Sequence, residues 1–88
     1  MPKILYFSAT WCGPCRTTGL VLKELKKDFP ELEVKKFDVD RNYEEAAQWK
    51  IKSVPTLICL KNSKEISRVV GARSKEDLIR ELELSVNL

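Results

Sequence analysis

A continuous apolar run near the start of the chain, Ile4-Leu5-Tyr6-Phe7, limits the possible folds more than any other feature. A strand without polar alternation is typical of a sheet position that is buried on both faces. The run is bounded by Lys3 and Ser8, and two cysteines follow it closely. The sequence therefore predicts a central strand over residues 4–7 that leads into Cys12 and Cys15.

A helix is predicted after the cysteines. Leu22, Leu25 and Phe29 recur at i, i+3 and i+7, which places them on one helical face. Pro30 ends this helix because proline has no N–H to donate and disfavours helical backbone in the residue before it.

The rest of the chain divides into five further elements. We predict a strand over residues 32–39, a short helix that starts at Asn42 with Glu45 in a capping pattern and runs through Trp49, and a strand over 56–60. A turn at 61–64 leads to an edge strand over 65–70, so these two strands form an antiparallel hairpin. The last helix begins at Ser74, which with Asp77 resembles a capping box, and its apolar stripe is Leu78, Ile79, Leu82 and Val86.

This order, β-α-β-α-β-β-α, predicts an α/β fold. The first two strands are joined by a helix, so they should be parallel with a right-handed crossover. The four-stranded sheet is then mixed, with helices on both faces. At 88 residues the chain is long enough for one domain, and residues 1–88 are taken as that domain.

Charge and hydropathy exclude several classes of function. Sixteen basic and 13 acidic residues give a net charge of +3. This charge is too small, and the basic residues are too scattered along the chain, to predict a nucleic acid or an anionic membrane as partner. Apolar runs stay far below the ~20 residues of a membrane span. The run after Lys3 is also too short for a secretory signal, so we expect a cytoplasmic, reducing environment.

Cys12 and Cys15 carry the chemistry. If the helix begins between them, both lie on one face of its first turn, and Cys12 lies at the positive end of the helix dipole. A dipole contribution of ~0.3–2 kcal/mol lowers a thiol pKa by roughly 0.2–1.5 units, which favours the reactive thiolate. A zinc site would need four ligands, but the chain has no histidine and only one other cysteine, Cys59. A structural disulfide is disfavoured in a reducing compartment.

Three segments together resemble the thioredoxin family. They are the motif Trp11-Cys12-Gly13-Pro14-Cys15, the segment Val54-Pro55-Thr56 and the pair Gly71-Ala72. The similarity extends over nearly the whole chain, which looks like a small, N-terminally truncated thioredoxin without the first strand and helix.

The resemblance implies a thiol–disulfide oxidoreductase, a protein-disulfide reductase that needs no cofactor or metal. Cys12 would be the nucleophile, since it is nearer the helix start and more exposed, and the buried Cys15 would be the resolving thiol. The two would form a disulfide after turnover. A cis peptide bond before Pro55 is expected. The residues expected to bind substrate are Trp11, Gly13, Pro14, Val54, Pro55, Gly71 and Ala72.

The implied partners are proteins with disulfides and, as electron source, a flavin-dependent thioredoxin reductase. The chain is expected to act as a monomer. Three alternatives stay open: a glutathione-dependent, glutaredoxin-like reductase, a dedicated donor to one enzyme, and a binding module whose cysteines are incidental.

Two departures from the family pattern concern proton transfer. Tyr6 stands where the family has a buried aspartate beneath the second cysteine, whereas the accompanying lysine is retained as Lys36. Tyrosine, with a reference pKa near ~10, is a poor base at neutral pH. Leu20 stands where the family has a proline in the first helix. Cys59 lies in an apolar strand and is interpreted as a core residue.

Overall fold

The computed structural model describes residues 2–84 and has the predicted order of elements. The strands are β1 (Lys3–Ser8), β2 (Glu33–Asp38), β3 (Thr56–Lys61) and β4 (Lys64–Val70), and the helices are α1 (Gly13–Asp28), α2 (Tyr43–Gln48) and α3 (Lys75–Glu81). Within this described part of the chain, no helix has the length and apolar character needed to cross a membrane.

The four strands form one mixed sheet in the order β2-β1-β3-β4. As predicted, β1 is parallel to β2 and β3 is antiparallel to β4, while β1 also pairs antiparallel with β3. The strand β1 is thus paired on both sides, and Ile4, Leu5, Tyr6 and Phe7 are each at most 4% exposed. The prediction of a central, fully buried strand is confirmed.

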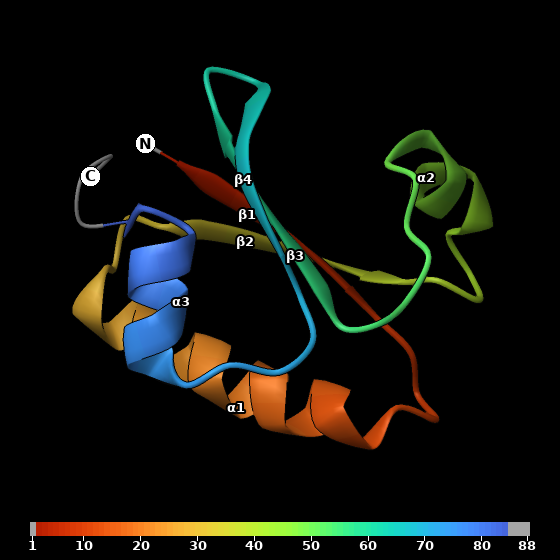
Figure 1. Ribbon diagram of the computed structural model, residues 1–88, viewed down its shortest axis with the longest axis horizontal. Coiled ribbons are helices and arrows are strands. Elements are labelled where there is room, and N and C mark those ends of the chain that lie inside the picture. The colour runs from red at the N-terminus through yellow and green to blue at the C-terminus, as the bar shows by residue number, and fades with distance from the viewer. Residues whose placement is uncertain (1, 85–88) are drawn as a thin grey trace.

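Helices cover both faces of the sheet (Figure 1). Alternate residues of β1 divide between the two faces, because neighbouring side chains of a strand point in opposite directions. Ile4 and Tyr6 belong to a cluster that also holds Leu25 of α1 and Leu78 of α3. Leu5 and Phe7 belong to a second cluster with Phe37. Ala46 of α2 and Trp49, at the end of this helix, pack against the cluster. The core therefore has two layers, and α1 lies in the larger one.

Residues close to the helix ends determine most of these ends. The helix α1 ends at Asp28, two residues before Pro30, and the Ser74 side chain accepts a hydrogen bond of 3.2 Å from Asp77 N at the start of α3. The predicted capping pattern at Asn42 is wrong in its detail, because the Asn42 side chain makes no capping bond. Its amide donates instead to the backbone oxygen of Asp38, 3.0 Å away. Val86, predicted on the last helical stripe, lies outside the described residues.

The hairpin turn is tighter than predicted. Lys61 and Lys64 belong to the strands, and only Asn62 and Ser63 connect them. Both have positive φ angles, 53° and 66°, as a two-residue turn of the type I′ family requires. The turn was predicted at the correct place but as four residues, 61–64. A two-residue turn was not expected because serine seldom adopts the positive φ angle that it requires.

Two leucines of α1 give a matched test of this packing. Leu25 is fully buried in the larger cluster, whereas Leu20 is 64% exposed on the same helix. We expect Leu25→Ala to lower the free energy of unfolding by about 2–5 kcal/mol, because it leaves a cavity. Leu20→Ala should change it by less than about 0.5 kcal/mol. Urea unfolding followed by circular dichroism measures both, and equal losses would contradict the assigned faces of α1.

Candidate active site

Cys12 caps the N-terminus of α1. Its backbone is extended, and helical backbone begins at Gly13, with Pro14 in the first turn, where its missing N–H costs nothing. The Cys15 N–H donates to Cys12 Sγ over 3.1 Å, and the two cysteines form a disulfide with their Cα atoms 5.3 Å apart. The sequence prediction that Cys12 lies at the helix start is confirmed.

The first turn of α1 favours negative charge at Cys12. The Cys15 N–H already points at the Cys12 sulfur, and the fully described first turn contains no acidic side chain. Free N–H groups and the positive end of the helix dipole stabilise an anion at this place. Once the disulfide is reduced, the same environment would stabilise a Cys12 thiolate.

Burial does not separate the two cysteines. Cys12 is 5% exposed and Cys15 is 4% exposed, so the expectation that Cys12 is the more exposed residue is wrong for this disulfide-bonded form. Cys12 packs in a small cluster with Ala9 and Val54, and this cluster covers it. The expected burial of Cys15 is confirmed, while Gly13 and Pro14 between the cysteines are exposed.

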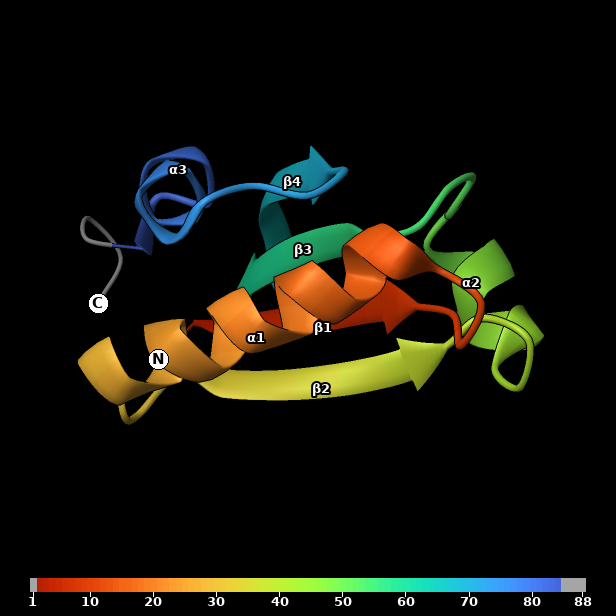
Figure 2. The ribbon, with the colours of Figure 1, turned by 90° about the horizontal axis from the view of Figure 1, so that it is seen from below.

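The segment before β3 lies at the same end of the sheet as the cysteine motif, as Figure 2 shows. The peptide bond from Val54 to Pro55 is cis, as expected. Val54 packs against the cluster of Ala9, Cys12 and Cys15. The structure therefore brings together two segments that lie some forty residues apart in sequence.

Gly71 joins the same end of the sheet through its backbone. Its N–H donates to the oxygen of Pro55 over 2.9 Å, and its φ angle of 94° suits glycine better than any other residue. The neighbouring Ala72 is exposed. A hollow of about 140 Å³ beside the motif is lined by Trp11 and Val54 but not by Gly71 or Ala72. Of the residues expected to bind substrate, Trp11 and Val54 thus share this hollow.

Asp40 is a site residue that the sequence analysis missed. The indole Nε1 of Trp11 donates to Asp40 Oδ2 over 2.9 Å, although the Trp11 side chain stays 70% exposed. The carboxyl ends of parallel strands meet at one edge of a sheet, so β1 and β2 place residues 9–12 beside residues 39–40. That pairing was predicted, and applying it to the polar residue after β2 would have indicated Asp40.

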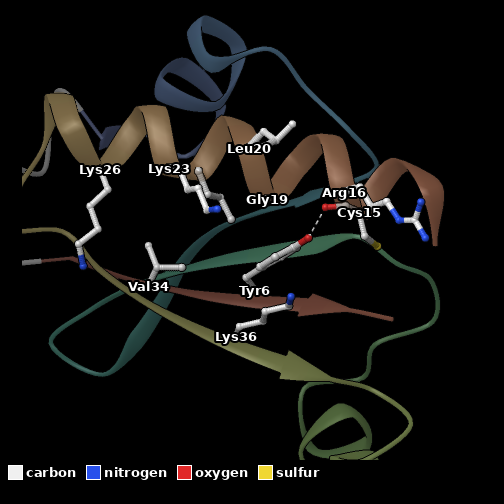
Figure 3. A pocket seen from close by; sticks show the side chains of 10 residues that line it. Tyr6, Cys15, Arg16, Gly19, Leu20, Lys23, Lys26, Val34 and Lys36 are labelled. Carbon is white, nitrogen blue, oxygen red and sulfur yellow. Dashed lines mark hydrogen bonds between the residues drawn. The ribbon is translucent and has the colours of Figure 1, made fainter. Parts of the chain in front are cut away.

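Tyr6 lies beneath the second cysteine and acts as a hydrogen-bond donor. Its hydroxyl donates to the backbone oxygen of Cys15 over 2.6 Å, as drawn in Figure 3. Burial raises the pKa of the Tyr6 hydroxyl above its usual value near 10. It therefore stays protonated at neutral pH. The Nζ atom of Lys36 lies 5.9 Å from the centre of the Tyr6 ring, so the structure brings this predicted pair together.

Cys59 is set apart from the motif. It is fully buried in the larger core cluster, and burial raises the pKa of its thiol, as expected for a core residue. Among residues 2–84 there is no group of three or more His, Cys, Asp or Glu side chains placed to hold a metal ion.

Comparison with known proteins agrees with this geometry. Residues 1–84 match the family model for thioredoxin. The chain belongs to the thioredoxin family. It is 47% identical over 76 residues to a thioredoxin H-type of Picea mariana. The match covers 86% of this chain and 60% of that protein. A thioredoxin of Mycobacterium bovis is 44% identical over 82 residues, with 92% of this chain and 71% of the relative covered.

Solved thioredoxin structures have the same fold. The X-ray structure of Fasciola hepatica thioredoxin superposes with a TM-score of 0.86 at 36% identity, covering 94% of this chain and 79% of that one. The present chain thus spans about three fifths to four fifths of the length of these thioredoxins. At the position where the family pattern has a buried aspartate, this chain has Tyr6, whose hydroxyl donates to the Cys15 oxygen.

The Tyr6 hydroxyl is expected to stabilise the start of α1. Tyr6→Phe removes its bond to the Cys15 oxygen and should lower the free energy of unfolding by about 0.5–1.5 kcal/mol. Tyr43→Phe is the matched control, since Tyr43 is 69% exposed, and it should have no measurable effect. Urea unfolding of the disulfide-bonded proteins at pH 7 measures both changes.

The pH dependence of the same pair tests the protonation of Tyr6. Because its pKa is higher in the folded than in the unfolded chain, its contribution is complete below about pH 10 and is lost as the pH rises through the folded pKa. The difference in stability between wild type and Tyr6→Phe should therefore shrink above pH 10. A difference that grows there would mean that the folded state favours the tyrosinate.

Proposed function

We propose that residues 1–88 form a single domain that reduces disulfide bonds in other proteins, with Cys12 as nucleophile and Cys15 as resolving thiol. One observation carries this proposal: the Cys12–Cys15 disulfide lies at the N-terminus of α1, where the Cys15 N–H donates to the Cys12 sulfur. Membership of the thioredoxin family supports the same activity.

The reaction consists of two thiol–disulfide exchanges. In the dithiol form, the Cys12 thiolate attacks one sulfur of the partner's disulfide, whose S–S bond breaks and releases a partner thiolate that takes up a proton. Cys15 then loses its proton and attacks Cys12 Sγ. The mixed disulfide breaks, and the second partner thiol is released. Two electrons have moved to the partner, and Cys12 and Cys15 are oxidised to the disulfide.

The assignment of roles rests on electrostatics rather than on exposure. Cys12 is the helix cap and receives the Cys15 N–H, so its thiolate is the stabilised one. Cys15 lies one turn into α1, farther from the free N–H groups at the helix start, so its thiolate is the less favoured of the two before the mixed disulfide has formed. Tyr6 holds the Cys15 carbonyl, and Lys36 lies over the Tyr6 ring, so both influence Cys15 indirectly.

The substrate is an extended protein segment that carries a disulfide. Trp11, Gly13 and Pro14 are exposed around the cysteines and offer contacts on one side. The backbone of Val54 beside Pro55 offers hydrogen bonds to an extended partner, as in strand addition. Gly71, whose N–H donates to the Pro55 oxygen, and the exposed Ala72 next to it complete the proposed contact surface.

A flavin-dependent thioredoxin reductase is the proposed electron source, and the domain acts as a monomer in the cytoplasm. The exchange uses only the two cysteines, so the domain requires no cofactor or metal of its own. Trp11 and the small hollow that it shares with Val54 provide an apolar contact surface for either partner.

Insulin reduction tests the activity. With dithiothreitol as electron donor, wild type should speed insulin precipitation well above the reductant alone, and Cys12→Ser should lose all of this acceleration. Cys15→Ser should instead accumulate a stable mixed disulfide with a substrate, visible on a non-reducing gel. Cys59→Ala is the matched control, because Cys59 is buried away from the motif, and it should keep the wild-type rate.

The outcome of that assay also separates the alternatives. Equal rates for wild type and Cys12→Ser would contradict the proposal, and partner binding that survives replacement of both motif cysteines by serine would favour a binding module. Faster reduction of the domain by glutathione than by a thioredoxin reductase would favour a glutaredoxin-like enzyme.

A carboxyl at position 6 should speed the second exchange. In Tyr6→Asp a carboxylate beneath Cys15 could accept the thiol proton, and a general base typically contributes about 10²–10⁴-fold. We therefore expect the mixed disulfide to resolve at least about tenfold faster than in wild type, measured by stopped-flow with a small disulfide substrate. Tyr6→Phe, which has no acid or base, is the control. Equal rates for Asp and Phe would mean that proton transfer at this position does not limit resolution.

A further inference from the structure

A second, larger hollow lies between α1 and the edge of the sheet formed by β1 and β2, with a volume of about 500 Å³. It is separate from the hollow at Trp11, and the two have no lining residue in common. Figure 3 shows Cys15 at one end of it and Tyr6 between α1 and Lys36. A volume of this size lies in the range of small-molecule sites, about 300–1,000 Å³.

The walls of this α1–β2 hollow are largely apolar. They include the ring of Tyr6 and the side chains of Leu20, Leu22 and Val34. Gly19 opens the wall on the helix side, because a Cβ atom there would find only the Tyr6 hydroxyl within 4 Å, at 3.9 Å. An apolar body could therefore lie along α1, past Gly19.

The border of the hollow is positively charged. Arg16, Lys23 and Lys26 come from α1, and Lys36 comes from β2 (Figure 3). No acidic side chain among the described residues lines the hollow. None of the four cations takes part in the ion pairs found in the described part of the chain. Two nearby lysines outside the hollow do form ion pairs: Lys27 with Glu24, and Lys3 with Glu33.

We propose that the α1–β2 hollow binds a small amphipathic carboxylate, with an aliphatic body and one anionic head. The apolar walls take the body, and the unpaired cations at the border attract the head. Lys26 lies ten residues beyond Arg16, about 15 Å along the helix, and this length suits a medium-length chain better than a bare anion. The site does not depend on the proposed reductase activity, because neither cysteine needs to react.

Octanoate is the first probe, with 1-octanol and octyltrimethylammonium as neutral and cationic controls of the same chain length. Amide chemical shifts in ¹⁵N-labelled, disulfide-bonded protein report where each compound binds. Octanoate should shift the amides of Gly19, Leu20 and Lys36 more than that of Trp11. It should also bind more tightly than octanol, while octyltrimethylammonium should bind weakest. From hexanoate to decanoate the affinity should rise by up to about fourfold per methylene.

Variants on one helix test the site itself. The double variant Lys23→Gln, Lys26→Gln should weaken octanoate binding by about tenfold, whereas Lys27→Gln, outside the hollow, should not change it. Gly19→Leu should fill the hollow and abolish binding, while Gly19→Ala should retain it. Both replacements favour helix over glycine, so loss of binding would not reflect loss of α1.

Three results would overturn the proposal: equal affinity for the three octyl compounds, shifts centred on Trp11, or undiminished binding by Gly19→Leu. Insulin reduction measured on the same preparations tests the proposed reductase activity separately from octanoate binding. Lack of octanoate binding with full reductase activity would refute this inference and leave the proposed function intact.

Discussion

The position at which α1 begins determines the chemistry available to this chain. Only residues 9–12 separate β1 from α1, and the buried face of the helix, with Leu22 and Leu25, fixes its rotation on the sheet. Given that rotation, Cys12 becomes the cap and Cys15 lies one turn further on, with its N–H directed at the Cys12 sulfur. Core packing 7 to 13 residues away in sequence thus sets the geometry of the two sulfur atoms.

The surroundings of the two cysteines differ in a way that follows from the same arrangement. Above the sheet edge, Cys12 is surrounded by the N-terminal dipole of α1 and by Val54 of a distant loop. Cys15 accepts from the Tyr6 hydroxyl through its backbone oxygen and lines the hollow bordered by Lys23, Lys26 and Lys36. The helix start is thus suited to a reactive anion, whereas Cys15 lies beside a largely apolar space.

Features set by neighbours in sequence were predictable, and features set by the tertiary structure were less so. The apolar run at residues 4–7, the stop at Pro30 and the Ser74 cap act locally, and each was predicted. The cis bond at Pro55 was expected only through the family resemblance. The bond from Trp11 to Asp40 joins residues 29 apart, and the burial of Cys12 depends on Val54, so neither follows from local pattern. The unpaired cations around the α1–β2 hollow likewise come from two elements that only the fold brings together.

The hydroxyl of Tyr6 has a consequence for how protons reach the site. A protonated phenol whose hydrogen is already given to the Cys15 carbonyl neither accepts nor supplies a proton at neutral pH. No acidic side chain among the described residues lines the hollow on which Cys15 borders. In the proposed cycle, the Cys15 proton therefore leaves and returns by a route that does not pass through the side chain at position 6.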